Sequence, residues 1–144
     1  MPRKIPSFVR EQVRQRAGSL CEYCHTDENW QLIPFTIDHV LAGGEDALDN
    51  LALACFHCNR RKSDRQSVFD VRTQKEILLF NPRLMLWAEH FMWSVDGLLV
   101  LPRTDIGRVT IEQLQLNRER ILRIRRDDVL VNRHPQIADP RETS

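Results

Sequence analysis

Two Cys-x-x-Cys pairs constrain this 144-residue chain more than any other feature of its sequence. Cys21 and Cys24 form the first pair, and Cys55 and Cys58 form the second. Two thiolates in such a pair can bind one metal ion from a single tight turn, and a second pair can complete a tetrahedral site. Four cysteine ligands leave no open position for water, so the sequence predicts a structural zinc site. The alternatives are a redox-active pair or buried free thiols.

Composition predicts one compact domain with an appended arm. Hydrophobic residues make up 42% of the chain and charged residues 28%, as in ordinary soluble proteins. The chain has no run of about 18 apolar residues, so we expect no transmembrane helix and no membrane partner. The first residues carry charge but no apolar signal segment, which favours a cytoplasmic protein. In that compartment, paired cysteines are typical of metal sites and not of disulfides.

The first half of the chain predicts a helix followed by a strand–loop–strand–helix unit. Apolar spacing indicates a first helix that Ser7 caps and Gly18 ends. Short strands over 32–40 and 51–54 flank a turn-rich loop, and a helix over 56–65 follows. Because these elements are too close together for a parallel crossover, we expect the strands to be antiparallel.

The second half predicts a β-hairpin and a C-terminal helix. Apolar residues over 91–95 and 98–101 flank a tight turn at Gly97. A capping box that begins at Thr110 predicts the start of a helix that ends near Arg126. The expected division is a core with its N-terminal helix, an extension packed on that core, and a loosely ordered tail, at 1–80, 81–130 and 131–144.

A second group of polar residues lies between and beside the cysteine pairs: Asp38, His39, Asn50 and Asn59. Around them, four stretches agree in order and approximate spacing with one known family: CEYC, FTIDHV, GGEDALDNLALAC and CFHCNRRKSD. In these stretches the chain resembles the HNH endonucleases, in their zinc-stapled branch. The similarity covers about residues 10–65. It implies an α+β fold with a ββα-metal core and a structural zinc ion held by the four cysteines, to which the flanking segments would add a preceding helix, a β-hairpin and a C-terminal helix.

The resemblance also implies roles for the polar residues. His39 would be the general base that takes a proton from the attacking water, and the ordinary pKa of imidazole suits this task. Asp38 and Asn59 would bind one catalytic divalent cation, Mg²⁺ or Mn²⁺, through oxygen. This cation would stabilise charge that develops on the scissile phosphate. Asn50 would hold the loop backbone and so orient His39. Many family members have histidine where this chain has Asn59.

Each of these residues also has a structural interpretation. Asp38 could merely orient His39, Asn50 could cap a loop, and Asn59 could be a polar residue in the first turn of a helix. Neighbouring residues of a regular strand point to opposite faces. Asp38 and His39 can therefore act on one phosphate only where the strand ends, or from two sides of the substrate.

Basic residues predict contact with nucleic acid. Only three of the 21 basic residues are lysines, and arginine is the side chain suited to bidentate phosphate binding. In the helix after the second cysteine pair, the residues expected to contact phosphates near the cut are Arg60, Arg61, Lys62 and Arg65. A solvated basic face is the alternative. A second arginine cluster over 118–126 predicts either DNA contact or ion pairing.

Together these features predict a metal-dependent endonuclease that hydrolyses phosphodiester bonds in DNA, and the resemblance to the HNH family implies 5′-phosphate and 3′-hydroxyl ends. One alternative is a non-catalytic, zinc-stabilised module that binds nucleic acid; another is a ribonuclease or a nuclease of a defence system. No specificity domain is recognised, so a partner protein could supply targeting. The sequence is compatible with a monomer or an oligomer. The formal net charge is only +1, so attraction to nucleic acid must be local and its salt dependence modest.

Overall fold

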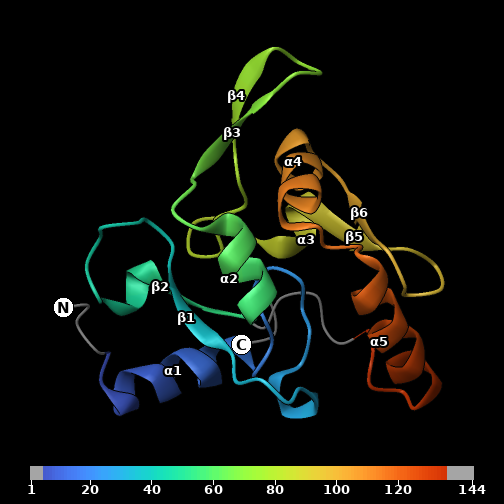
Figure 1. Cartoon of the computed structure of the whole chain (residues 1–144), viewed down its shortest axis with the longest axis horizontal. Helices are drawn as coiled ribbons and strands as arrows, with labels where there is room; N and C mark the ends of the chain where they lie inside the picture. Colours follow the sequence, from blue (N-terminus) through green and yellow to red (C-terminus); the bar gives the residue numbers. More distant parts are fainter. Residues whose placement is uncertain (1–4, 136–144) are drawn as a thin grey trace.

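The computed structural model describes residues 5–135, which form a mixed α and β fold with three two-stranded antiparallel sheets (Figure 1). The elements follow one another as α1 (Ser7–Ala17), η1 (Glu28–Trp30), β1 (Thr36–His39), η2 (Leu48–Asn50), β2 (Leu51–Ala54), α2 (Phe56–Lys62), β3 (Ser67–Asp70), β4 (Lys75–Leu78), α3 (Trp87–His90), β5 (Phe91–Trp93), β6 (Val100–Pro102), α4 (Asp105–Leu114) and α5 (Glu119–Leu130). The expected α+β class is confirmed. Of the expected tail, 131–144, residues 136–144 lie outside the described part of the chain.

For helix α1, the sequence predicted the C-terminal end correctly but not the N-cap residue. Pro6, and not Ser7, is the N-cap residue, and its carbonyl accepts the amide of Arg10 at 3.1 Å. Gly18 ends the helix in a left-handed conformation with φ of 63°, as expected for a C-terminal glycine. Val13 and Ala17 are buried on the side that contacts β2.

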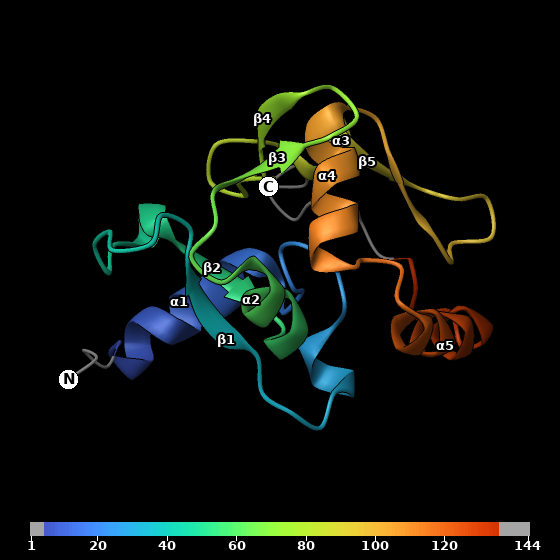
Figure 2. The ribbon, with the colours of Figure 1, turned by 45° about the horizontal axis from the view of Figure 1, so that its top comes forward.

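The ββα unit predicted from the sequence is present, with shorter elements. Strands β1 and β2 are antiparallel, with Asp38 opposite Ala52. Strand β1 begins only at Thr36, because the amide of Phe35 donates to the Glu28 carboxylate. Helix α2 ends at Lys62, where Ser63 adopts a positive φ of 52°. All of β2 is buried because it contacts both α1 and α2, which lie on either side of it (Figure 2).

The β3–β4 hairpin was not predicted, and it protrudes from the rest of the molecule in Figure 1. Two Asp70 oxygens accept bonds from Arg108 of α4 at 2.7 and 3.1 Å, which ties the hairpin to that helix. Arg108 also holds the pKa of the Asp70 carboxyl well below its usual range. The strands alternate too weakly between apolar and polar residues to be recognised, so this contact across the chain decides the structure.

The prediction of one continuous C-terminal helix that starts at Thr110 is wrong, because the structure has two helices and the first starts earlier. Helix α4 begins at Asp105, with Thr104 as the N-cap residue, whose hydroxyl accepts the Gly107 amide at 3.1 Å. Thr110 is buried inside this helix and donates to the Ile106 carbonyl, so it caps nothing. The chain then breaks at Gln115, which has a left-handed φ of 50°, before α5 begins.

The predicted β5–β6 hairpin is present, but its connection is longer than expected. The strands end at Trp93 and resume at Val100, with Ser94 and Leu99 joined by a backbone hydrogen bond of 2.9 Å. Gly97 lies within this loop and has the positive φ of 75° that glycine adopts at low cost. The tight turn at Gly97 is therefore replaced by a loop over 94–99.

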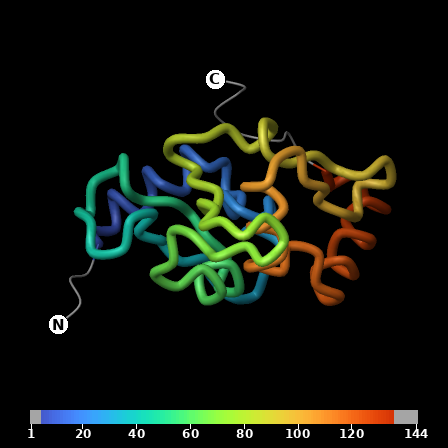
Figure 3. The backbone as a smooth tube through the Cα atoms, turned by 90° about the horizontal axis from the view of Figure 1, so that it is seen from above, coloured from blue at the N-terminus to red at the C-terminus, as the bar shows by residue number. Residues whose placement is uncertain are grey.

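One connected apolar core joins the two halves of the chain. It extends from Val13 of α1 to Leu116 after α4, and it includes all four cysteines. A Cβ atom on Gly107 would lie 2.0 Å from the carbonyl oxygen of His90, so α4 packs directly on the end of α3. Figure 3 shows α1 and α5 at opposite ends of the molecule. Among residues 5–135, no helix is long and apolar enough to span a bilayer.

Candidate functional site

The four cysteines meet in a buried cluster, as the sequence predicted. The first pair lies in a turn closed by the His25 amide on the Cys21 carbonyl at 2.9 Å, and the second pair opens α2 with Cys55 as its N-cap residue. Their sulfur atoms all lie within 4.8 Å of one another, and the Cys24 and Cys55 sulfurs are 3.8 Å apart. A tetrahedron with Zn–S bonds of about 2.3 Å has edges of about 3.8 Å. The cluster therefore fits a structural zinc ion with four thiolate ligands.

Asp38 points inward from β1, where its carboxylate forms an ion pair and accepts a hydrogen bond. Its carboxylate accepts the Tyr23 hydroxyl at 2.7 Å and lies 3.2 Å from the Lys62 ammonium. Burial raises the pKa of Asp38, while Lys62 and Tyr23 act in the opposite direction and favour the ionised form. Burial and the neighbouring aspartate also raise the pKa of Tyr23, which keeps that hydroxyl a donor.

His39 is the last residue of β1 and points the other way, toward the loop that joins β1 to β2. Its Nε2 atom lies 2.5 Å from an oxygen of Asp46, a loop residue. This contact leaves Nδ1 as the ring nitrogen that faces no partner from the described chain. The carboxylate therefore fixes the orientation of the ring.

Asn50 closes the same loop through both ends of its amide. Oδ1 accepts the Leu41 amide at 2.9 Å, and Nδ2 donates to the carbonyls of Leu41 and Glu45 at 3.2 and 3.1 Å. A Cβ atom on Gly44 would lie 2.5 Å from Nδ2, so the loop needs glycine for this close approach. Asn50 thus holds the backbone of the loop that carries Asp46.

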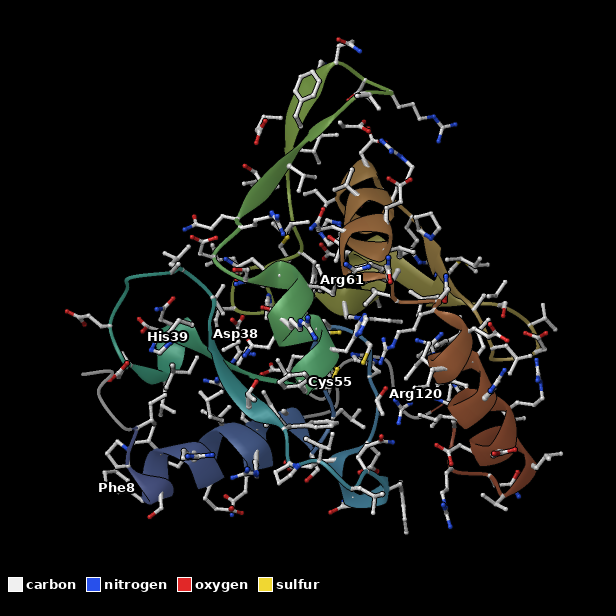
Figure 4. All side chains as sticks on the ribbon, in the orientation of Figure 1. Phe8, Asp38, His39, Cys55, Arg61 and Arg120 are labelled. Carbon is white, nitrogen blue, oxygen red and sulfur yellow. The ribbon has the colours of Figure 1, made fainter. Side chains whose placement is uncertain are left out.

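Three of the predicted polar residues line one open cleft between β1 and α2. Asp38 and His39 of the strand and Asn59 of the helix border it, with Gly43 and Ser63 at its margin, although the Asp38 carboxylate itself is buried. Figure 4 shows Asp38 and His39 on the same side of α2. The strand ends at His39, so both neighbouring side chains border the cleft although they point in different directions. Asn50 supports the cleft from the loop and does not line it.

The basic residues in and just after α2 differ in exposure and in the direction that they face. Arg60 is exposed and borders the cleft, and Arg65 is exposed after the helix and donates to the Arg61 carbonyl. Arg61 lies on the flank that faces α4, where its carbonyl accepts from Gln113. Lys62 corrects the expectation of an outward basic face, because it is only 2% exposed. It follows Cys58 by one helical turn and therefore shares the inward face.

Sequence reasoning missed two residues that the structure places at this site. Tyr23 lies inside the first cysteine pair, and its hydroxyl reaches Asp38. Asp46 lies in the turn-rich loop and reaches His39. The available signals were a tyrosine between two cysteines and a carboxylate after a Gly-Gly pair. Neither pattern indicates which residue the side chain contacts.

Residues 21–65 match the model of a protein family described as HNH endonuclease. The matched segment contains the four cysteines and the polar residues at positions 38, 39, 50 and 59. The cysteine cluster fits the zinc-stapled branch of this family. Comparisons with curated proteins and with solved structures gave no significant match.

Proposed function

Because residues 21–65 belong to the HNH endonuclease family, we propose that this protein is a metal-dependent endonuclease that hydrolyses phosphodiester bonds in DNA. The observation that carries the proposal is that Asp38, His39 and Asn59 border one cleft beside the buried cysteine cluster. A module that only bound nucleic acid would have no need of a histidine oriented by a carboxylate in that cleft.

The cysteine cluster would serve the fold and not the reaction. Its four thiolates would fill all the positions of a tetrahedral zinc ion, so no position remains for water or substrate. The proposed location is the cytoplasm, where paired cysteines are typical of metal sites and not of disulfides.

Asp38 and Asn59 are the residues that would hold the catalytic cation. A carboxylate and an amide oxygen are hard ligands of the kind that Mg²⁺ and Mn²⁺ prefer. When bound, such a cation stabilises the negative charge that develops on the phosphate and the leaving oxygen. Tyr23 and Lys62 hold the Asp38 carboxylate in place from the core side.

His39 is the proposed general base. With Nε2–H donating to Asp46, the other ring nitrogen, Nδ1, is free to accept a proton from a water molecule in the cleft. Asp46 would then stabilise the imidazolium formed by that transfer. Asn50 keeps the intervening loop in the conformation that brings Asp46 to the ring.

The substrate strand would lie along the cleft, where Arg60 is placed to contact a phosphate beside the cut; Arg65 follows helix α2, and Arg61 lies on the flank of that helix that faces α4. Such contacts position the backbone but read no sequence. The proposed partner is therefore DNA recognised through its phosphates, with targeting supplied by other factors.

A plasmid assay tests the proposal. Zinc-loaded protein is incubated with supercoiled plasmid and Mg²⁺ or Mn²⁺, beside a His39→Ala variant and a His90→Ala control, since His90 lies at a distance on α3 and contacts Thr104. We expect nicking by the parent and the control and none by His39→Ala. Unchanged activity in His39→Ala would refute the mechanism. Binding without nicking would support the non-catalytic alternative, and cleavage of RNA alone would identify a ribonuclease.

A further inference from the structure

Helix α2 presents a second polar flank, opposite the cleft. Residues advance by about 100° each around a helix, so Asn59 and Arg61 lie about 200° apart. Asn59 faces the cleft, and Arg61 faces the C-terminal part of the chain, where Gln113 donates to its carbonyl and His57 contacts the Leu114 carbonyl at 3.0 Å. In Figure 4, Arg61 lies on the side of α2 away from Asp38 and His39.

A second arginine comes to this flank from the other half of the chain. Arg118 is the N-cap residue of α5, and its amide donates to the Gln115 carbonyl at 3.2 Å, one residue beyond the Leu114 carbonyl that contacts His57 of α2. The two arginines are both partly buried.

Neither guanidinium has a partner within residues 5–135. Arg61 and Arg118 form no ion pair and no side-chain hydrogen bond there, and each has a buried nitrogen without an acceptor, Nε in Arg61 and Nη1 in Arg118. Two acidic residues of α4 and α5 have other arginines as neighbours: Glu119 pairs with Arg123 at 2.8 Å, and Glu112 lies 3.7 Å from Arg108.

Two unpaired, partly desolvated cations on one surface are unfavourable in the free protein, and an anion would relieve the cost. A guanidinium offers a planar fork of donors that matches phosphate oxygens, and a small rotation of each side chain toward a phosphate would supply the missing acceptors. Arg120, exposed in the first turn of α5, lies between α2 and α5 in Figure 4 and extends the positive surface.

We propose that Arg61 and Arg118 form a second phosphate-binding site, which holds the backbone of the nucleic-acid substrate on the flank of α2 opposite the cleft. This proposal rests on the proposed function, because the ligand of the site is taken to be nucleic acid. It assigns a substrate-binding role to the C-terminal extension, which lies outside the matched segment, residues 21–65. Because these arginines do not border the cleft, they bind substrate and take no part in proton transfer.

Fluorescence anisotropy with a labelled DNA duplex tests the site on zinc-loaded protein, without added Mg²⁺, so that binding is measured apart from cleavage. The variants are Arg61→Gln, Arg118→Gln and the double variant. Arg123→Gln is the matched control, because it removes the same charge from α5 but from a guanidinium already paired with Glu119. Thermal unfolding and zinc content verify that each variant is folded.

We expect each substitution to weaken binding about tenfold, as for the loss of a charge-assisted hydrogen bond. Each should also reduce the slope of log K against log salt by about 1, and Arg123→Gln should change both much less. In the nicking assay, KM should rise while kcat stays the same. Affinity and salt slope equal to those of Arg123→Gln would overturn the proposal.

The two proposals fail separately. If the parent cleaves DNA and the arginine variants bind like the control, the phosphate site is refuted and the nuclease stands. If the parent does not cleave but the variants lose DNA binding, the phosphate site stands and the nuclease is refuted. Inorganic phosphate as a competitor distinguishes the source of the anion: variants that lose phosphate binding but keep duplex binding would also overturn the site.

Discussion

The buried Lys62–Asp38 pair gives the sharpest prediction about stability. The ammonium lies 3.2 Å from the carboxylate, the two side chains are 3% and 4% exposed, and the carbonyls of His39 and Val40 accept from the same ammonium at 3.3 and 3.2 Å. Lys62→Met keeps the length of the side chain but removes every one of these donors. Removing one partner of a buried pair costs about 3–5 kcal/mol, because the other charge stays buried without compensation.

The measurement is urea unfolding of zinc-loaded protein, followed by circular dichroism at a fixed zinc concentration. Lys75→Met is the control, because Lys75 is exposed on β4 and should change the free energy of unfolding by no more than about 0.5 kcal/mol. Combining Lys62→Met with Asp38→Asn should cost less than the sum of the single changes. If Lys62→Met matched the Lys75→Met control, the reasoning about the buried pair would be wrong.

Three further predictions concern the zinc cluster and the loop. Cys55→Ser should lower zinc content well below the parent's and destabilise the fold, as measured by metal analysis and thermal unfolding; full zinc retention would contradict a four-cysteine site. Asp46→Ala should lower kcat about 10–100-fold without weakening DNA binding, whereas Asp49→Ala, an exposed carboxylate of the same loop, should not. Gly44→Ala should displace the Asn50 amide and lower nicking; parental activity would show that the close approach is dispensable.

The ββα unit could be predicted from the sequence because its signals are local. The cysteine pairs, the Gly-Gly loop and the apolar run at β2 each mark an element within a few residues of it. The β3–β4 hairpin and the start of α4 could not be predicted in this way. Asp70 is held by an arginine 38 positions away, and Thr110 has the spacing of a cap but accepts the amide of Phe80, 30 positions earlier.

The same distinction separates the site residues that were predicted from those that were missed. The resemblance to the HNH family pointed to Asp38, His39 and Asn59 as candidates, and all three border one cleft. It gave no information on direction, so Lys62 was counted with the exposed arginines although its ammonium points into the core. Arg118 could not be assigned from the sequence either, because its position depends on the break between α4 and α5.

The cysteine cluster and the cleft are connected by two residues that lie close to the cysteines in the sequence and contact Asp38. Tyr23 lies between the two cysteines of the first pair, and Lys62 follows Cys58 by one turn of α2. These are the two residues that hold the Asp38 carboxylate from the core side. A zinc ion that fixed both cysteine pairs would therefore also fix Asp38. It follows that loss of zinc should disturb the proposed ligand of the catalytic cation even though zinc itself takes no part in the reaction, so nicking activity should fall together with zinc content.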